Sequence, residues 1–282
     1  MNLAAETPVR QVPYKDIKPQ IGAQVLLDKR ALLSGIYAAE LRELLEQKGV
    51  VVFPQVHFTD QEQIAFTKTL GTFAPEIRGE EIYKITLDKS QTSTAEYLKG
   101  AFYWHFDGFM NPMPIRASIL SSKVLSPSGG NTEFANTYAA YEALPEERKR
   151  QVASLRAVHA LAATQLYVDP EPSYEKFKEW RGVGLGRAEL PLVWKHKSGR
   201  KSLVIGNSAL NILGMDPLDG IELLIFLRDW ATQERFHYSH KWSVGDAVMW
   251  DNTGTLHRAT PYPLDCGRML HRTKLQGEEP LN

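Results

Sequence analysis

Apolar residues recur at helical spacing in several parts of the chain, and shorter apolar runs lie between them. The spacing predicts a helix over residues 34–48, followed by a buried strand over residues 50–53. Residues 59–62 have the pattern of a capping box and predict the start of a second helix. Two more helices are predicted over residues 138–155 and 217–233. Helices therefore occupy the early and middle parts of the chain.

The remaining periodic segments are short and strand-like. They cover residues 117–125, 191–195, 202–206, 246–250, 255–258 and 268–275. Short strands throughout, with helices between them, predict a β-sandwich or barrel with helices packed outside. Residues 164–190 are rich in charge, proline and glycine, so we expect a long excursion of the kind that forms lids. A chain of 282 residues is compatible with one large domain over residues 1–282.

Composition narrows the class of protein. The 33 lysine and arginine residues balance 33 aspartate and glutamate residues, so no basic excess indicates a nucleic-acid or membrane partner. No apolar stretch reaches the roughly 20 residues needed to cross a bilayer, and the N-terminus lacks a signal-peptide pattern. The single cysteine, Cys266, fits a reducing compartment. We therefore expect a soluble cytoplasmic protein.

His105 and Asp107 interrupt an apolar run over residues 104–110. On a strand, alternate side chains share a face, so His105 and Asp107 would point the same way and Phe106 would point to the opposite face. With one more histidine they would form the two-histidine, one-carboxylate triad that is diagnostic of non-haem Fe(II) oxygenases. A buried, hydrogen-bonded His–Asp pair is the alternative that these residues alone leave open.

The third ligand must come from elsewhere in the chain, and His257 is the candidate. It follows a strongly apolar strand and lies shortly before Arg268, across a Pro-Tyr-Pro turn. If residues 255–259 and 268–274 form a hairpin, His257 and Arg268 lie close together, and Arg268 could grip a carboxylate that also chelates the metal. A surface salt bridge is the alternative for Arg268. The other histidines considered lie in loops, near helix ends or beside polar turns: His57, His159, His196, His237 and His240.

Together these motifs resemble the taurine dioxygenase/2,4-dichlorophenoxyacetate dioxygenase family of Fe(II)- and 2-oxoglutarate-dependent oxygenases. The resemblance runs along nearly the whole chain, and the order and spacing of the motifs make it specific. The motifs are Gly49-Val-Val-Val-Phe53, Trp104-His-Phe-Asp107, Ser128-Gly-Gly-Asn-Thr-Glu133, Ser198-Gly-Arg-Lys201, Gly245-Asp-Ala-Val-Met-Trp-Asp-Asn252, Leu256-His-Arg258 and Arg268-Met-Leu-His-Arg272.

The resemblance implies a mainly β fold, a double-stranded β-helix (jelly-roll, cupin-like) core with helices packed outside. It implies His105, Asp107 and His257 as Fe(II) ligands, and Arg268 with Thr132 as the grip on the distal carboxylate of 2-oxoglutarate. The Thr132 hydroxyl can donate one hydrogen bond to that carboxylate; otherwise Thr132 is an ordinary strand residue. The implied reaction consumes O2 and 2-oxoglutarate, yields succinate and CO2, and hydroxylates a substrate. A carbon–heteroatom bond can break if the hydroxylated carbon carries a heteroatom.

Arg272 bears on the substrate. It lies four residues after Arg268, an even offset that keeps both on one face of a strand. The matching arginine of taurine dioxygenase holds the sulfonate, so the resemblance implies a small anionic substrate. The alternative is that Arg272 supports the cofactor site only.

Other pocket positions depart from taurine dioxygenase. Phe102 and Tyr103 would make the entrance apolar, and Leu161 and Ala209 fall near family positions that are aromatic there, leaving room for a bulkier group. Residues 75–103 show no counterpart of the polar cluster that recognises taurine. These differences make taurine doubtful and favour an anion (a carboxylate, sulfonate or sulfate) with an aromatic or alkyl body. The alternative is that the substrate is taurine, an alkyl sulfonate or an alkyl sulfate.

Two other classes of function remain as alternatives. A zinc hydrolase also uses two histidines and a carboxylate, but it needs no carboxylate grip from Arg268 and Thr132. A non-catalytic 2-oxoglutarate-binding module would not need a complete ligand set. The presence of Asp107 disfavours halogenation. Members of the family often form dimers or tetramers, and no feature of the sequence decides the homo-oligomeric state.

Overall fold

The computed structural model describes residues 11–76, 79–92, 94–182 and 186–281. Within them, eight strands form a large sheet in the order β1-β2-β3-β14-β6-β16-β4, and β5 also pairs with β16. Neighbours are antiparallel except β2 and β3, which are parallel. The strands are β1 (Tyr14–Asp16), β2 (Ala23–Val25), β3 (Val50–Phe53), β4 (Phe73–Ala74), β5 (Tyr83–Ile85), β6 (Ala117–Val124), β14 (Ala247–Asp251) and β16 (Met269–Leu275).

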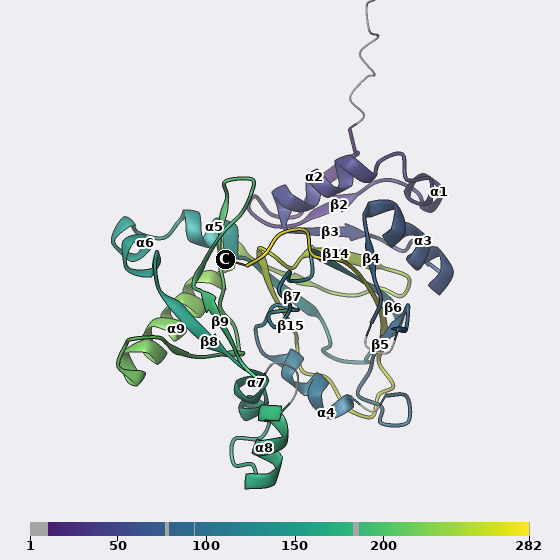
Figure 1. Cartoon of the computed structure of the whole chain (residues 1–282). Helices are drawn as coiled ribbons and strands as arrows, with labels where there is room; N and C mark the ends of the chain where they lie inside the picture. The colour runs from purple at the N-terminus through teal and green to yellow at the C-terminus, as the bar shows by residue number, and fades with distance from the viewer. Residues whose placement is uncertain (1–10, 77–78, 93, 183–185, 282) are drawn as a thin grey trace, which may run out of the picture.

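A second sheet, in the order β13-β7-β15, lies beside the large one (Figure 1). Its strands are β13 (His237–His240), β7 (Thr132–Asn136) and β15 (Thr255–Ala259). One core cluster joins residues of both sheets, including Phe134 of β7, Leu120 of β6, and Trp250 of β14. Further strands pair in the order β12-β8-β9 and as β10-β11: β8 (Arg156–His159), β9 (Ala188–Pro191), β10 (Val193–Lys195), β11 (Lys201–Leu203) and β12 (Ala209–Ile212).

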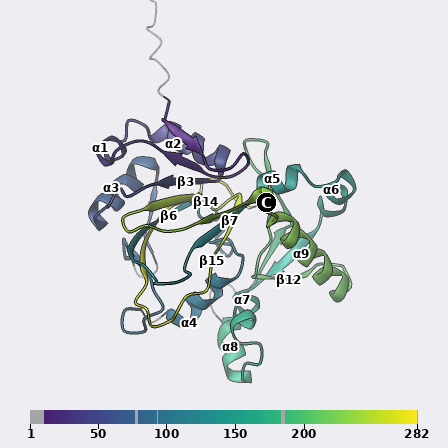
Figure 2. The ribbon, with the colours of Figure 1, turned by 180° about the vertical axis from the view of Figure 1, so that it is seen from behind.

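Helices cover the outside of this β core on two sides. On one side lie α1 (Lys29–Leu33), α2 (Ala38–Lys48) and α3 (Asp60–Leu70), and their buried leucines and Phe66 pack on Phe53 and Ile119 of the large sheet. On the other side lie α5 (Thr137–Glu142), α6 (Glu146–Val152) and α9 (Pro217–Ala231) (Figure 2), and α9 packs against β12 while α5 packs against β11. The predicted arrangement of a β core with helices outside is confirmed. No helix among the described residues is long and apolar enough to span a membrane.

Local signals explain some of the helix boundaries. The capping box is present at α3: the Thr59 hydroxyl accepts from the Glu62 amide, and the Glu62 carboxylate accepts from the Thr59 amide. The single helix predicted over residues 138–155 is wrong, because α5 and α6 are separated by a break that contains Pro145. Proline lacks the N–H that would continue the helical ladder, but it fits immediately before a new helix.

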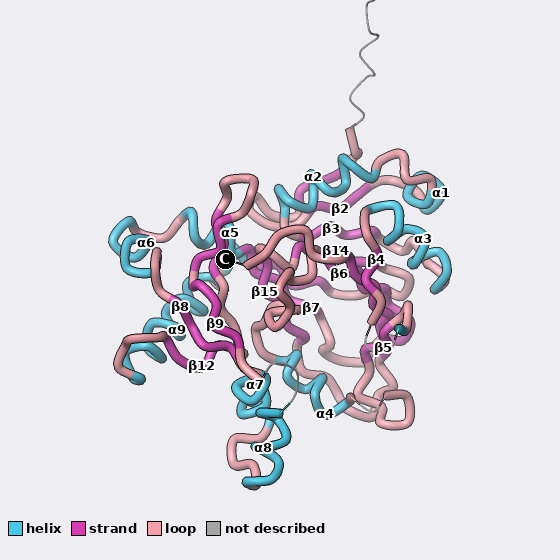
Figure 3. Tube along the Cα trace, viewed as in Figure 1, coloured by secondary structure: helices cyan, strands magenta, loops and turns pink. Residues whose placement is uncertain are grey.

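The charged segment 164–190 is largely helical where it is described. It contains most of α7 (Leu161–Val168), then α8 (Tyr174–Gly182), and it reaches β9. Both helices lie at one edge of the molecule near the short helix α4 (Ala95–Leu98) (Figure 3). The helical pattern was hidden in the sequence, because prolines and charges flank the two short helices.

The predicted hairpin between residues 255–259 and 268–274 is wrong. β15 pairs with β7 in the small sheet, whereas β16 pairs with β6, β5 and β4 in the large one. The Pro-Tyr-Pro segment therefore joins strands of two different sheets. The two strands still meet at one pocket, where both His257 and Arg268 lie in the wall.

Candidate active site

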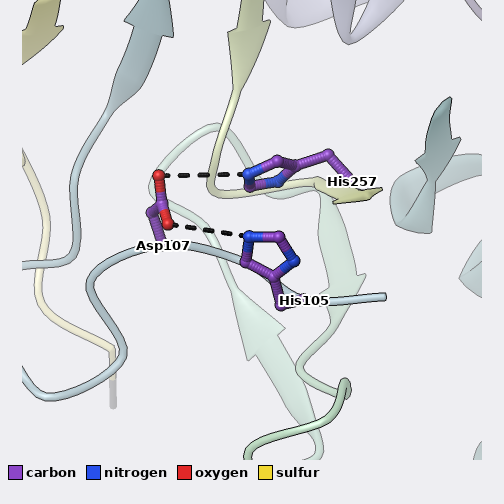
Figure 4. Close-up of side chains that lie close together, drawn as sticks. All are labelled: His105, Asp107 and His257. Atoms are coloured by element: carbon purple, nitrogen blue, oxygen red, sulfur yellow. Dashed lines mark ion pairs between the residues drawn. The ribbon is translucent and has the colours of Figure 1, made fainter. Parts of the chain in front are cut away.

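Three side chains from two distant parts of the chain come together in the wall of one pocket. His105, Asp107 and His257 each offer one ligand atom, and these atoms all lie within 4.8 Å of one another (Figure 4). The Nε2 atoms of His105 and His257 lie 3.9 Å from Oδ1 and Oδ2 of Asp107, respectively. The amides and carbonyls of His105 and His257 exchange two backbone hydrogen bonds of 3.1 and 2.8 Å. This bridge fixes the two imidazoles side by side.

The strand predicted at His105 and Asp107 is wrong, because these residues do not form a regular strand. His105 makes only an isolated bridge to His257, and Asp107 begins a turn. The turn brings Asp107 back toward the two imidazoles. Phe106 packs in a core cluster beside Phe109 and also borders the pocket, so its expected orientation away from the site holds only in part.

The donor set fits a divalent metal ion. The His105 ring donates from Nδ1 to the carbonyl of Tyr103 at 2.8 Å, which orients the ring with Nε2 toward Asp107. Burial holds the pKa of His257 well below its ordinary value, so this imidazole is neutral. Burial alone would raise the pKa of Asp107, but the surrounding positive charges, with Arg272 the largest, together outweigh it and lower this pKa to about 2. One carboxylate and two neutral imidazoles are the ligands that Fe(II) takes in a facial triad.

The triad opens into a pocket with a volume of about 260 Å³, which we call the triad pocket. Of the residues selected from the sequence, Thr132, Leu161, Arg268 and Arg272 lie in its wall together with the triad. Much of the remaining wall is apolar and includes Ile85, Leu98, Phe109, Leu120, Trp250 and Leu270.

Arg268 and Thr132 can grip a carboxylate within this pocket. Arg268 is only 3% exposed, donates from Nη2 to the carbonyl of Gly130 at 2.9 Å, and has no described partner at Nε. Gly130 has a φ of 73°, and a Cβ there would lie 2.9 Å from Arg268 Nε, so glycine makes room for the guanidinium. The Thr132 oxygen accepts from Trp242 Nε1 at 3.0 Å, which leaves the hydroxyl hydrogen free to be donated.

Arg272 lies in the same wall, and its guanidinium already has two protein partners. Nη1 donates to Asp107 Oδ2 at 2.9 Å, while Nε and Nη2 donate to the carboxylate of Glu76 at 3.0 and 3.1 Å. Glu76 has no periodic or motif signal in the sequence. It was missed because only its contact with a strand nearly 200 residues later gives it a role.

Three residues selected for the pocket lie elsewhere. Phe102 packs edge-on against Tyr262 at 5.5 Å between ring centres. Tyr103 and Ala209 line a separate cavity between α7, β12 and α9. These positions were chosen by counting along the sequence motifs of the family, and such counting does not locate side chains on irregular segments. Phe102, for example, is the last residue of a turn of 3-10 helix. The side chains that take their place in the pocket wall, Thr164, Gln165 and Asn207, had no signal in the sequence.

A comparison with protein-family models decides the family. Residues 13–274 match the family described as "Taurine catabolism dioxygenase TauD, TfdA family". The chain belongs to this family. Its reaction class is therefore that of a 2-oxoglutarate-dependent dioxygenase, which uses Fe(II), 2-oxoglutarate and O2.

Relatives in the TauD/TfdA family extend the match over almost the full chain. A (S)-phenoxypropionate/alpha-ketoglutarate-dioxygenase of Sphingobium herbicidovorans is 33% identical over 94% of this chain and 96% of its own. An alpha-ketoglutarate-dependent 2,4-dichlorophenoxyacetate dioxygenase of Cupriavidus pinatubonensis is 34% identical over 87% and 91%.

A solved TauD/TfdA-like structure confirms the jelly-roll fold. The crystal structure of AAD-2 in complex with Mn(II) and N-oxalylglycine superposes with a TM-score of 0.84 at 31% identity, covering 97% of this chain and 99% of that one. Membership of a dioxygenase family also removes the zinc-hydrolase and non-catalytic alternatives.

Proposed function

We propose that this dioxygenase hydroxylates a small organic anion with an aromatic or alkyl body. The iron is held by His105, Asp107 and His257. The distal carboxylate of 2-oxoglutarate is bound by Arg268 and Thr132. The anionic group of the substrate is bound by Arg272. The observation that carries the proposal is the Arg272 guanidinium in the wall of the triad pocket, beside Asp107 and among apolar side chains. A buried cation next to apolar parts of the wall favours a ligand that combines a negative charge with an apolar body.

The apolar part of the wall supports an aromatic or alkyl body. Leu161 and Phe109 line the pocket together with Ile85 and Leu98. The ammonium group of taurine would lose hydration against this apolar part of the wall, so taurine is disfavoured. The related enzymes named for 2,4-dichlorophenoxyacetate and (S)-phenoxypropionate act on aromatic ethers that carry a carboxylate, which agrees with this wall.

The contribution of the protein is positioning and exclusion of water. Iron bound at the triad supplies the activation of dioxygen that couples conversion of 2-oxoglutarate to succinate and CO2 with oxidation of a substrate C–H bond. Arg268 and Thr132 orient one end of 2-oxoglutarate, and Arg272 fixes the anionic end of the substrate near Asp107. With a phenoxyalkanoate, hydroxylation of the ether carbon gives a hemiacetal, which collapses to a phenol and a carbonyl compound.

A substrate panel tests the proposal. Phenoxyacetate, hexyl sulfate and taurine are each supplied with Fe(II), 2-oxoglutarate and O2, and both succinate and substrate-derived product are measured. We expect one product per succinate with phenoxyacetate and little stimulation by taurine. Preference for hexyl sulfate would move the assignment to alkyl sulfates, and preference for taurine would overturn the proposed body.

Arg272→Ala separates substrate binding from cofactor binding. We expect it to weaken phenoxyacetate binding strongly, while 2-oxoglutarate binding and its uncoupled turnover largely survive. Arg228→Ala, which removes an exposed guanidinium paired with Asp229, is the matched control and should change neither. Loss of 2-oxoglutarate binding in Arg272→Ala would instead assign Arg272 to the cofactor site.

We also propose that residues 1–282 act as one domain in the cytoplasm and associate as a homo-oligomer. The family match over residues 13–274 supports one unit, and the thiol of Cys266, which is not in a disulfide, supports a reducing compartment. Thr164 and Gln165 of α7 lie in the pocket wall, which supports a covering role for segment 164–190. The exposed Leu218, Ile221 and Ile225 along α9 support self-association, which light scattering would test as the mass in solution.

A further inference from the structure

Four buried or half-buried charged side chains of alternating sign form a row beside the triad pocket. Lys274 Nζ lies 2.7 Å from Glu76 Oε2, Glu76 receives two bonds of 3.0 and 3.1 Å from Arg272, and Arg272 donates to Asp107 at 2.9 Å. The Glu76 side chain is 4% exposed. Lys274 and Arg272 share a face of β16, and Glu76 reaches them because it follows β4, whose Ala74 pairs with Lys274.

Glu76 determines how the Arg272 guanidinium is presented. Its two carboxylate oxygens take the Nε–Nη2 side of the guanidinium in a bidentate pair, which fixes the plane of the group. Nη1 is then the nitrogen that extends to Asp107, and Arg272 lies in the pocket wall. Glu76 and Lys274 are not part of that wall. Glu76 is therefore a positioning residue that acts through Arg272.

The row also determines how much charge the pocket offers to a ligand. The charge of Asp107 belongs with the metal ion that the triad would hold. Glu76 cancels one of the two positive charges of Arg272 and Lys274, so one positive charge remains for the substrate. A buried site binds best the ligand charge that its own residues leave unbalanced, because an excess charge of either sign is costly in low dielectric.

We propose that the carboxylate of Glu76 leaves the pocket with one uncompensated positive charge, so that the pocket binds monoanions in preference to dianions. Glu76 also orients the Arg272 guanidinium toward the anionic group of the substrate. This inference rests on the proposed function, because it takes Arg272 as the residue that binds the substrate anion. The substrate class then narrows to carboxylates, sulfonates and sulfate monoesters. A phosphate monoester loses its second proton with a pKa near 6 and is a dianion at higher pH. Phosphate monoesters are therefore excluded because of their charge and not because of their shape.

Phenyl sulfate and phenyl phosphate test this charge rule, because they have nearly the same shape and differ by about one charge at pH 8. Dissociation constants of both are measured by calorimetry on protein loaded anaerobically with Fe(II) and 2-oxoglutarate. The unaltered protein should prefer phenyl sulfate. Glu76→Gln should shift the ratio of the two constants toward phenyl phosphate by about tenfold or more. Glu81→Gln, at an exposed glutamate paired with Lys68, should leave the ratio unchanged.

Two further variants keep the test decisive if Glu76→Gln folds poorly. Lys274→Met leaves no spare positive charge and should weaken binding of both ligands. The double variant Glu76→Gln/Lys274→Met restores one spare charge and should restore the preference for phenyl sulfate. An unchanged ratio in folded Glu76→Gln, or unchanged affinities in Lys274→Met, would overturn the charge rule.

Arg272→Ala distinguishes the failure of this inference from that of the proposed function. If Arg272→Ala weakens phenyl sulfate binding and Glu76→Gln leaves the ratio unchanged, only the role of Glu76 is wrong. If phenyl sulfate does not bind, or binds Arg272→Ala as well as the unaltered protein, the proposed anion site itself is wrong.

Discussion

The two faces of β16 carry two buried polar clusters of opposite character. Toward α3, Gln63 donates from Nε2 to the carbonyls of His271 and Ile119, and its Oε1 accepts from Ser121 at 2.6 Å. Thr273 bonds to Thr67 at 2.7 Å. All these side chains are neutral and paired. Toward the triad pocket, the cluster is charged, and buried nitrogens of His257, Arg268 and Gln165 in the pocket wall have no partner among the described residues.

We interpret the difference as one between a polar cluster that stabilises the fold and one that is arranged to bind ligands. An unpaired buried polar group costs about 1–3 kcal/mol, so a purely structural cluster is expected to pair every group, as Gln63 and its neighbours do. Arg268 keeps an unpaired Nε, and such a cost is tolerated where a ligand supplies the missing partner. Loss of a residue on the first face should therefore reduce stability, and loss on the second should reduce binding.

The largest expected effect is on the pocket side. Asp107→Ala should lower the affinity for Mn(II) by more than about 100-fold. Loss of a residue that only hydrogen-bonds to a metal ligand lowers metal affinity by at most roughly 100-fold, and Asp107 is assigned as a ligand itself. Equilibrium dialysis measures this affinity, and Asp219→Ala, on the exposed first turn of α9, is the control. Retained Mn(II) affinity in Asp107→Ala would remove this carboxylate from the metal site.

Next is the α3 side, where stability is the readout. Gln63→Met keeps the side-chain length but removes the amide that bonds to Ser121 and two carbonyls, so it should lower the free energy of unfolding by about 2–3 kcal/mol. Denaturant titration measures this change, and Gln61→Met, exposed on the same helix, is the control. Mn(II) affinity should be unchanged. A parallel loss of metal binding would show that the two faces are not independent.

A smaller effect is expected at the carboxylate grip. Thr132→Val removes the hydroxyl that is free to donate, so the dissociation constant of 2-oxoglutarate should rise about tenfold, the value of one hydrogen bond to a charged group. Calorimetry on the Mn(II)-loaded protein measures it, with Thr232→Val at the end of α9 as control. An unchanged constant would return Thr132 to the role of an ordinary strand residue.

The smallest expected effect concerns the residue that orients Thr132. Trp242→Phe removes the indole N–H that is donated to the Thr132 oxygen, and it leaves most of the ring volume in place. The 2-oxoglutarate constant should rise about threefold, because the hydroxyl is then less well oriented. In the Thr132→Val background the same change should have no further effect. Additive effects in the double variant would mean that Trp242 acts by another route.

Positions selected from the sequence lie together in the structure where residue chemistry and local pattern coincide. The triad, Arg268 and Thr132 were selected from residue type and family resemblance, and the structure places them around one pocket. The capping box at 59–62 was readable because it depends only on residues in sequence contact.

Features that depend on distant contacts were not readable. The Pro-Tyr-Pro segment leads from one sheet to another, which local turn rules cannot distinguish from a hairpin. Glu76 is an ordinary glutamate until β4 places it beside Arg272. Tyr103 and Ala209 lie on segments whose side-chain directions are set by packing with α7 and α9, so counting positions placed them in the wrong cavity.

The central claim is that the triad and the carboxylate grip together bind Fe(II) and 2-oxoglutarate. One spectroscopic measurement tests this claim most directly. Fe(II) and 2-oxoglutarate are added to the protein without oxygen, and the visible spectrum is recorded for the unaltered chain and for Asp107→Ala. A charge-transfer band should appear in the unaltered protein and be absent in the variant. Absence of the band in the unaltered protein, or its persistence in Asp107→Ala, would contradict the assignment of this site.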